Sequence, residues 1–282
     1  MEARIEIRKL KDDLTVDPSQ PRFEIAGENE GNLHVHLATE LSGLADPVVE
    51  ANTKSPGGRP GQRLLSTRFT ERNIVFRVTI LGDPDNIYRR ESAWRSAWSY
   101  TSYTEMAYTV NGYTSVIRLR LEDYELDTSH DPAVQGAVDV VMSVVADDPF
   151  WYERDSLQFF ELGRQILRPL DVMHGPVFPV FRISGVSGSG NIIVEAIQPD
   201  GSGRGFRLPT PELRSDATYI VDTDPGARQW QSVEDPNVWN RMNGVRYRLE
   251  GTESATQMRI ASTFNQGVEV QVAIPFLRPW RY

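Results

Sequence analysis

Residues 71–121 read ERNIVFRVTILGDPDNIYRRESAWRSAWSYTSYTEMAYTVNGYTSVIRLRL, and they predict a strand, a helix and a hairpin in close succession. Near its start, apolar side chains recur at every second position, which predicts a strand with one buried face. These side chains are Ile74, Phe76, Val78 and Ile80. Asp83-Pro84 then predicts the start of a helix, with Asp as the N-cap and Pro at the first helical position. Trp94 and Trp98 lie on one side of this helix, which should run to about Ser99 and pack on a sheet.

A hairpin completes this unit. Asn111-Gly112 tolerates the positive φ angles of a two-residue type I′ turn, so residues 103–121 are predicted to form two strands about it. With Asn111 and Gly112 as the loop, the register of the strands follows. The predicted pairs are Val110–Tyr113, Tyr108–Ser115, Met106–Ile117 and Glu105–Arg118. A slip of one residue would move Met106 off the face that carries Ile117.

Alternating or short apolar runs predict further strands in both halves of the chain. In the first half these are 4–10, 23–25, 33–37, 64–70 and 134–146. In the second half they are 178–183, 191–197, 205–208, 217–222, 245–250, 257–262 and 268–274. Residues 44–62 contain Pro and Gly and show no period, so they predict a long, exposed loop.

The length of 282 residues favours two domains over one core. We predict a mainly β protein with one or two helices. Residues 1–160 should form a β-rich α+β domain, and 161–176 should form a linker, because Pro169 and Gly175-Pro176 interrupt the pattern. Residues 177–282 carry short strands at turn-punctuated spacing, which is typical of a β-sandwich.

Composition narrows the classes of function. The net charge of −9 argues against non-specific binding to nucleic acid. The chain has no cysteine, which excludes disulfides and thiolate metal sites. We expect no membrane segment, because no apolar run reaches 18 residues and the N-terminus is charged.

Charge is distributed unevenly along the first half. Residues 51–100 contain 9 basic and 4 acidic side chains, whereas residues 101–150 contain 2 basic and 9 acidic ones. A solvated surface explains this contrast, but so do subunits of a ring that meet through opposite charges. Both interpretations stay open at this point.

No pattern of side chains predicts catalysis, a cofactor or a metal. His34 and His36 would face one side of a strand, but no carboxylate spacing completes a metal site. Asp147 and Asp148 are adjacent on a strand, so their carboxyl groups point to opposite faces and cannot flank one bond.

Three aromatic residues in the second half, Trp230, Trp239 and Tyr247, have two interpretations. They could form a platform for sugar rings, or they could pack in the core, where Trp and Tyr are usually buried.

The order of these features resembles a known family. A loop rich in Gly and Pro precedes the strand, helix and hairpin of 72–121, and the Val-rich strand that follows ends in Asp147-Asp148-Pro149-Phe150-Trp151-Tyr152. This order is similar to that of the distal tail proteins, or siphovirus-type minor tail proteins, of long-tailed phages, especially phages of actinobacteria. The resemblance covers residues 1 to about 155. The second half, which ends in Phe276-Leu277-Arg278-Pro279-Trp280, is similar to the galectin-like or carbohydrate-module-like domain of such proteins.

The resemblance implies a structural virion protein without enzymatic activity. It implies a distal tail hub, a homo-hexameric ring at the virion tail tip that joins the tail tube to the baseplate or tail-tip apparatus, assembled in the host cytoplasm. The first domain would form the ring, and the second would point outward. The implied partners are the tail tube protein, the tape measure protein, the tail-tip hub or lysin, and receptor-binding or fibre proteins.

The loop at 44–62 is the predicted contact with a neighbouring subunit or the tube, because it is long and carries no catalytic group. The candidate contact residues are Asp46, Pro47, Pro56, Arg59 and Pro60. The alternative function is a carbohydrate-binding module protein for a host cell-surface glycan. A glycan-cleaving enzyme ranks third, since it would need a pair of carboxylates that the sequence does not present.

Overall fold

The computed structural model describes residues 3–38, 41–55, 57, 61–127, 129–163, 165–169, 177–224, 227–241 and 256–280. Over these residues the protein is mainly β with a few short helices. The chain divides into two compact units, Met1–Trp151 with Leu277–Tyr282, and Tyr152–Phe276. The end of the chain therefore belongs to the first unit, so the second unit is inserted in its sequence.

The first unit is one large sheet with a hairpin and two helices. Its elements are β1 Arg4–Lys9, β2 Arg22–Ala26, β3 Val35–Leu37, β4 Val49–Lys54, β5 Arg63–Phe69, β6 Arg72–Leu81, α1 Ile87–Ser96, β7 Thr104–Val110, β8 Tyr113–Leu126, α2 Pro132–Gln135 and β9 Ala137–Ala146. β10 Trp151–Glu153 spans the boundary in sequence.

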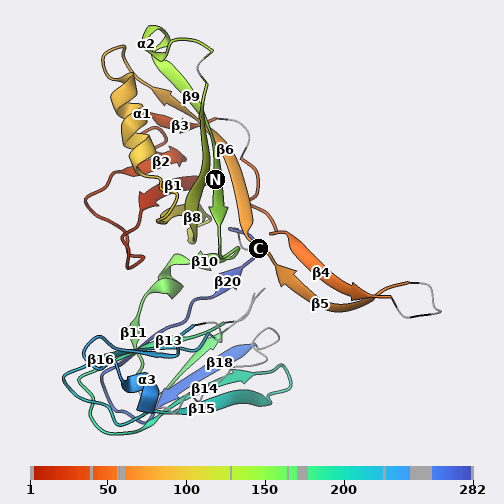
Figure 1. Ribbon diagram of the computed structural model, residues 1–282, viewed down its shortest axis with the longest axis vertical. Helices are drawn as coiled ribbons and strands as arrows, with labels where there is room; N and C mark the ends of the chain where they lie inside the picture. Colours follow the sequence, from red (N-terminus) through yellow and green to blue (C-terminus); the bar gives the residue numbers. More distant parts are fainter. Residues whose placement is uncertain are drawn as a thin grey trace. The chain divides into compact units, whose positions relative to one another are not determined.

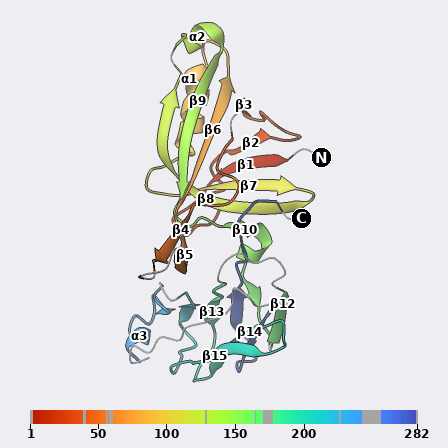
Figure 2. The same ribbon diagram turned by 90° about the vertical axis from the view of Figure 1, so that its right-hand side faces the viewer.

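The strands of the large sheet run in the order β2-β1-β7-β8-β9-β6-β3, with antiparallel neighbours. Figure 2 shows β8, β9 and β6 side by side as long strands that reach toward α2. The two end strands, β2 and β3, lie next to each other, so the sheet is nearly closed into a barrel. Closure covers strand edges that would otherwise be free to pair with other chains.

The hairpin of β7 and β8 confirms the predicted register. Val110 pairs with Tyr113 and Met106 with Ile117, as the turn chemistry requires. Asn111 and Gly112 have φ angles of 52° and 82°, the left-handed values of a type I′ turn. β8 is longer than its partner, and its second half pairs with β9 instead.

Helix α1 starts later than the sequence predicts. Its N-cap is Asn86, not Asp83. Asn86 and Asp83 are joined by two hydrogen bonds. Asp83 N donates to Asn86 Oδ1 at 2.8 Å, and Asn86 Nδ2 donates to Asp83 Oδ2 at 3.0 Å. Asp83-Pro84 therefore forms a turn that precedes the helix.

The core of the first unit centres on the predicted tryptophans. Trp94 and Trp98 are buried, with ring centroids 5.5 Å apart. Phe23 of β2 meets Trp94 edge-on at 5.0 Å, and Phe76 of β6 lies 5.9 Å from Trp98. Strands at or next to both ends of the strand order thus contribute to one core, and each buried aromatic ring adds on the order of 2–3 kcal/mol of transfer free energy.

The second unit is a sandwich of two sheets. Its elements are a 3-10 turn η1 Arg154–Leu157, β11 Phe160–Glu161, β12 Gln165–Pro169, β13 Val180–Ser184, β14 Asn191–Ile197, β15 Gly203–Pro209, β16 Thr218–Asp222, β17 Trp230–Gln231, α3 Val238–Arg241, β18 Gln257–Ser262, β19 Val268–Gln271 and β20 Pro275–Phe276. One sheet has the order β11-β19-β13-β16-β17 and the other β12-β18-β14-β15.

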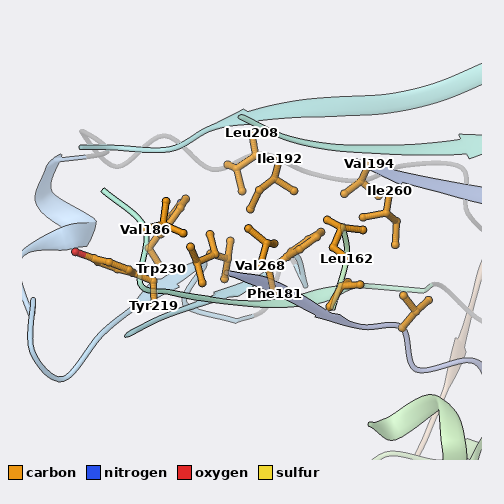
Figure 3. Packing of buried hydrophobic residues seen from close by; sticks show 14 of the residues in the cluster. Leu162, Phe181, Val186, Ile192, Val194, Leu208, Tyr219, Trp230, Ile260 and Val268 are labelled. Atoms are coloured by element: carbon orange, nitrogen blue, oxygen red, sulfur yellow. The ribbon is translucent and has the colours of Figure 1, made fainter. Parts of the chain in front are cut away.

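Alternate residues of both sheets fill one core between them. Figure 3 shows Ile192, Val194 and Ile260 facing Phe181 and Val268 across this core. Burial alternates with period 2 in β14 and β18, as expected for strands with one face in the core. The predicted strand at 245–250 lies outside the described residues.

Two stretches in which the sequence shows no hydrophobic period also contain strands. The expected loop at 44–62 contains β4, so the segment is half of a hairpin rather than a loop. The stretch 161–176 includes β12, which pairs with β18 in the second unit. Among the described residues, no helix is long and apolar enough to cross a bilayer.

Candidate functional site

The clearest candidate surface is a hairpin that projects from the first unit, formed by β4 and β5 (Figure 1). We call residues 48–70 the arm. Val49 pairs with Phe69 at its base and Lys54 with Arg63 at its outer end, with a register shift between Asn52 and Thr53. Thr53 Oγ1 donates to Gln62 Oε1 at 3.0 Å near the outer end.

The arm is exposed on both faces. All of β4 is exposed, and in β5 all but Phe69 is exposed. Its apolar side chains share this exposure, which reaches 67% at Val48 and 57% at Leu64. A two-stranded hairpin without a covering layer is marginally stable in water. Burial against its own unit therefore contributes little to the stability of the outer part of the arm.

The base of the arm is held by Arg72, the first residue of β6, which is only 2% exposed. Its Nη1 donates to the carbonyl oxygens of Gly43 at 2.9 Å and Leu44 at 3.1 Å, and also to that of Ala45. Its Nε donates to Pro149 O at 2.8 Å, and its Nη2 donates to Leu277 O at 2.7 Å. One side chain thus joins the start of the arm to two distant parts of the chain.

Burial lowers the pKa of Arg72 to about 10, and nearby Asp46 opposes this shift. The group therefore keeps its charge at neutral pH. The partners of the guanidinium in this cluster are carbonyl oxygens, which carry no formal charge. Their hydrogen bonds compensate the desolvation of the cation, since bonds to a charged group are worth more than neutral ones.

Gly43 allows the chain to pass close to β6 at this point. Its φ is +85°, and a Cβ there would lie 2.1 Å from Asn73 O. Ser42 forms an isolated bridge with Val75. The backbone therefore approaches β6 too closely for any side chain, which brings the carbonyl groups of 43–45 within reach of Arg72.

Two further contacts fix the base of the arm. Arg278 donates to both carboxylate oxygens of Asp46, at 2.7 and 2.8 Å. This pair is partly exposed, so it contributes about 0.2–1 kcal/mol. Phe69 meets Phe150 edge-on, with ring centroids 5.2 Å apart. The arm is thus rigidly joined to its unit while its outer half is in solvent.

The predicted contact residues fall in different places. Asp46 forms the ion pair with Arg278, and Pro47 is buried at the base of the arm. Pro56, Arg59 and Pro60 lie outside the described residues.

The three candidates for an aromatic platform fall in different environments. Trp230 is fully buried in the sandwich core, beside Tyr219 at a centroid distance of 6.4 Å. Trp239 packs partly buried against the same core, and Tyr247 lies outside the described residues. A fully buried indole cannot stack on a sugar, so the core interpretation holds for Trp230.

Sequence reasoning missed Arg72, Gly43 and Arg278. A signal for Arg72 was present, because it has the same strand parity as Ile74 and Phe76 and thus lies on the buried face. A charged residue at such a position requires partners inside the protein. Its partner at Leu277, 205 positions away, has no sequence signal.

Other titratable groups form structural pairs. Glu6 of β1 is fully buried and accepts hydrogen bonds from Arg8, at 2.7 Å, and from Arg22. His36 Nδ1 lies 3.3 Å from Glu30 Oε1, and His34 is outside β3 with a φ of 64°. Within the described residues, no three potential ligands gather into a metal site.

The second unit has a polar groove of about 460 Å³ on the outer face of its four-stranded sheet. Its lining includes Gln165, Glu195, Arg207 and Arg259. Arg259 forms an ion pair with Glu195 across β18 and β14. Ile193 and Ala261 provide apolar floor between these polar groups.

Comparison with curated proteins identifies two relatives of similar length. The chain is 30% identical to the minor tail protein Gp27 of Mycobacterium phage L5 over 319 aligned positions, covering 92% of this chain and 94% of that protein. It is also 30% identical to the minor tail protein Gp27 of Mycobacterium phage D29, with the same coverage. No family model matches the chain.

Solved structures share the fold at low sequence identity. The chain is similar to the Dit protein, gp 19.1, of phage SPP1, with a TM-score of 0.53 and 12% identity over 85% of this chain and 93% of that one. It is also similar to a chain of the phage P2 baseplate in its activated conformation with Ca, with a TM-score of 0.54 and 10% identity over 99% of this chain and 100% of that one. The form with Sr gives a TM-score of 0.57 at 10% identity, over 98% and 99% of the two chains.

Proposed function

This chain belongs to the family of the mycobacteriophage minor tail proteins named Gp27, and we propose that it is the distal tail hub of its phage. It is a component of the virion tail, in a family of structural proteins with a Dit-like fold. The SPP1 Dit protein is described as a paradigm of the hub adsorption apparatus in phages that infect Gram-positive bacteria. The proposal extends that role to this chain.

In this proposal six copies form a ring that joins the tail tube to the baseplate or tail-tip apparatus. The first unit makes the ring, and the second unit is a galectin-like sandwich that serves as an attachment module. The neighbours would be the tail tube protein, the tape measure protein, the tail-tip hub or lysin, and receptor-binding or fibre proteins. A hub acts through its contact surfaces, so the proposal includes no catalysed reaction.

One observation carries the proposal: the arm is anchored firmly at its base and uncovered on both faces. Burying its exposed leucines and valines against a neighbour would contribute about 25 cal/mol for each Å² of apolar surface removed from water. A ring supplies this cover to every copy at once, because each subunit presents one surface to its left and another to its right.

The test is the mass of the purified full chain in solution. A ring of six 31.9 kDa chains should have a mass of about 190 kDa by light scattering. Negative-stain images should show a six-fold ring with a central opening. A monomer at tens of micromolar that also fails to assemble on added tail tube protein would overturn the proposal.

The polar groove of the second unit favours a second candidate, binding of a host cell-surface glycan. Its carboxylate, guanidinium and amide groups can exchange hydrogen bonds with hydroxyl groups, and about 460 Å³ is enough for a short oligosaccharide. Calorimetric titration with soluble fragments of host cell-wall polysaccharide tests this candidate. Binding that is lost in Arg207→Ala would support it, and the same affinity in that variant would contradict it.

A further inference from the structure

The outer end of the arm presents positive charge on both of its strands. Lys54 of β4 pairs directly with Arg63 of β5, and both residues are exposed. Like charges that face each other across a strand pair destabilise it. An acidic surface placed against the arm would convert this repulsion into attraction.

The same end of the arm also presents apolar surface. Leu64 and Leu65 follow Arg63 and are 57% and 53% exposed. Because successive side chains of a strand point to opposite faces, the two leucines lie on different faces of the arm. Whichever face meets a partner therefore offers a leucine beside basic groups.

The far end of β8 has the opposite charge. β7 accompanies β8 only as far as Leu119, which pairs with Thr104, and beyond this point β8 continues beside β9 to Leu126. The exposed side chains of this second stretch are mainly acidic. They are Glu122, Asp123, Glu125 and, just beyond the strand, Asp127.

A groove of about 410 Å³ lies beside these carboxylates. Its lining is Arg77, Glu125, Leu126, Asp127, Ser129 and Val141. Leu126 is 38% exposed and can receive an apolar side chain. The backbone N–H of Ser129 donates to Asp127 Oδ1 at 3.0 Å, and this bond holds the pKa of Asp127 below its usual range. We call residues 122–127 with this groove the acidic end.

Within one chain, the arm and the groove beside Leu126 lie at different positions along β9. The arm joins β6 at Arg72, which pairs with Ala146 at one end of β9, whereas Leu126 pairs with Val140 toward the other end. Figure 1 shows the arm projecting away from the end of the sheet that carries α2. A surface at one end and its complement at the other make a head-to-tail contact between copies.

We propose that the arm of one copy docks on the acidic end of the next copy. Lys54 and Arg63 of the arm face the carboxylates of residues 122–127, and Leu64 or Leu65 enters the groove beside Leu126. The proposal rests on the ring of the proposed function and names the surface that receives the arm. Its basic and acidic groups are part of the charge contrast between residues 51–100 and 101–150.

The absence of cysteine makes a direct test possible, because every thiol in a variant is an introduced one. The full-length variants are Leu64→Cys with Leu126→Cys, and Leu65→Cys with Leu126→Cys. A disulfide forms only when two Cα atoms come within about 7 Å. Mild oxidation of the assembled protein should give a ladder of covalent oligomers on a non-reducing gel for at least one pair.

In the matched control, the second cysteine is introduced at an exposed position elsewhere on β8 instead of at Leu126. Tyr113→Cys, at the start of β8, is exposed but lies far along the strand from Leu126. Combined with Leu64→Cys or Leu65→Cys it should give no ladder. Each single-cysteine variant should give at most a dimer.

Charge reversal provides the second readout. Lys54→Glu with Arg63→Glu should lose assembly, as should Glu122→Lys with Asp123→Lys, and the four changes combined should restore it. The docking site is wrong if the wild-type chain forms a ring of normal mass, neither cysteine pair cross-links, and the four combined charge changes do not restore assembly. The hub function would be unaffected by that result. If the wild-type chain never assembles, the hub function and the docking site both fail.

Discussion

At the scale of single residues, the guanidinium of Arg72 joins three separate stretches of the first unit. It binds the carbonyl oxygens of 43–45, of Pro149 and of Leu277. β10, which begins two residues after Pro149, pairs with β20, which ends just before Leu277. The guanidinium therefore ties the stretch 43–45 to two stretches that strand pairing already holds close together.

Replacing Arg72 by Met should lower the free energy of unfolding by about 3 kcal/mol or more, because the buried carbonyl of Pro149 and the partly buried carbonyls of 43–45 and Leu277 would lose their donor. Denaturant unfolding followed by tryptophan fluorescence measures this loss. Arg89→Met, on the exposed side of α1, is the control and should change stability by less than about 0.5 kcal/mol. A loss below about 1 kcal/mol at Arg72 would mean that water replaces the guanidinium.

Asp235 predicts a pH dependence in the second unit. It is 5% exposed, accepts a hydrogen bond from Tyr219 Oη at 2.9 Å and forms an ion pair with Arg241. Arg241 is the main reason why the pKa of Asp235 lies below its ordinary 3.8. A lowered carboxyl pKa contributes stability that is present above the ordinary value and is lost as pH falls through the folded value.

The unfolding temperature of the second unit should therefore depend little on the ionisation of Asp235 between neutral pH and about pH 4. Below about pH 4 the unfolding temperature should fall. Asp235→Asn should remove that part of the acid slope and lower stability at neutral pH by about 1–3 kcal/mol. Asp216→Asn is the comparison, because its pair with Arg214 is exposed and screened by solvent. Equal slopes for the wild type and Asp235→Asn would refute the assignment.

At the scale of elements, the arm is separate from the core of its unit. At its base Thr70 N donates to Val48 O at 3.1 Å, which closes the hairpin, and Phe69 meets Phe150 of the unit. The outer residues of β4 and β5 are exposed. Stability of the unit and assembly of the ring should therefore depend on different parts of the hairpin.

Replacing residues 50–68 by Asn-Gly would keep Val49 beside Phe69 and remove the exposed part of the arm. The shortened chain should unfold within a few degrees of the wild type but should run as a monomer in light scattering. The matched control replaces Asn111-Gly112, the turn between β7 and β8, by Gly-Gly. This variant leaves the arm intact and should assemble. A shortened chain that still forms the ring would show that the arm is not the contact.

At the scale of the whole molecule, the end of the chain belongs to the first unit. Removing everything after Trp151 would also remove Leu277, a partner of Arg72, and Arg278, the partner of Asp46. A truncation of this kind weakens the base of the arm. A first unit intended to fold alone needs its last residues.

Joining Trp151 to Leu277 through a short Gly-Ser linker should give a folded first unit that still assembles, because Arg72 bonds both Pro149 O and Leu277 O and so keeps the two ends close. Residues 152–276 alone should be a folded monomer. Circular dichroism and light scattering on both proteins measure these outcomes. If residues 152–276 assemble while the joined first unit is a monomer, the ring contacts belong to the second unit and the prediction is wrong.

Salt should weaken the ring of the joined first unit. Raising salt from about 0.1 M to about 1 M shortens the screening length from about 10 Å to about 3 Å, which weakens attraction between exposed charges. The ring should dissociate at a higher protein concentration in high salt, as measured by mass photometry. A dissociation that is independent of salt would indicate an interface dominated by apolar contacts.

Local patterns predicted much of the fold. Asn111-Gly112 set the register of β7 and β8, since a two-residue turn leaves only one pairing, and the alternation of Ile74, Phe76 and Val78 identified the buried face of β6. The sequence pattern did not predict β4 of the arm. Apolar residues alternate with polar ones only when one face of a strand is buried, and both faces of β4 are exposed. The site at its base was hidden for a related reason, since Arg72 and Leu277 are distant in sequence.

The β-rich class, the turn chemistry and the family can be assigned from the residues alone, because each depends on neighbouring residues or on their order along the chain. Three features are visible only in the folded protein: Trp230 lies in the core, Arg72 holds the base of the arm, and the chain end returns to the first unit. These features depend on contacts between segments far apart in sequence. Such contacts form only when closure of the sheets brings those segments together, and no local period records them.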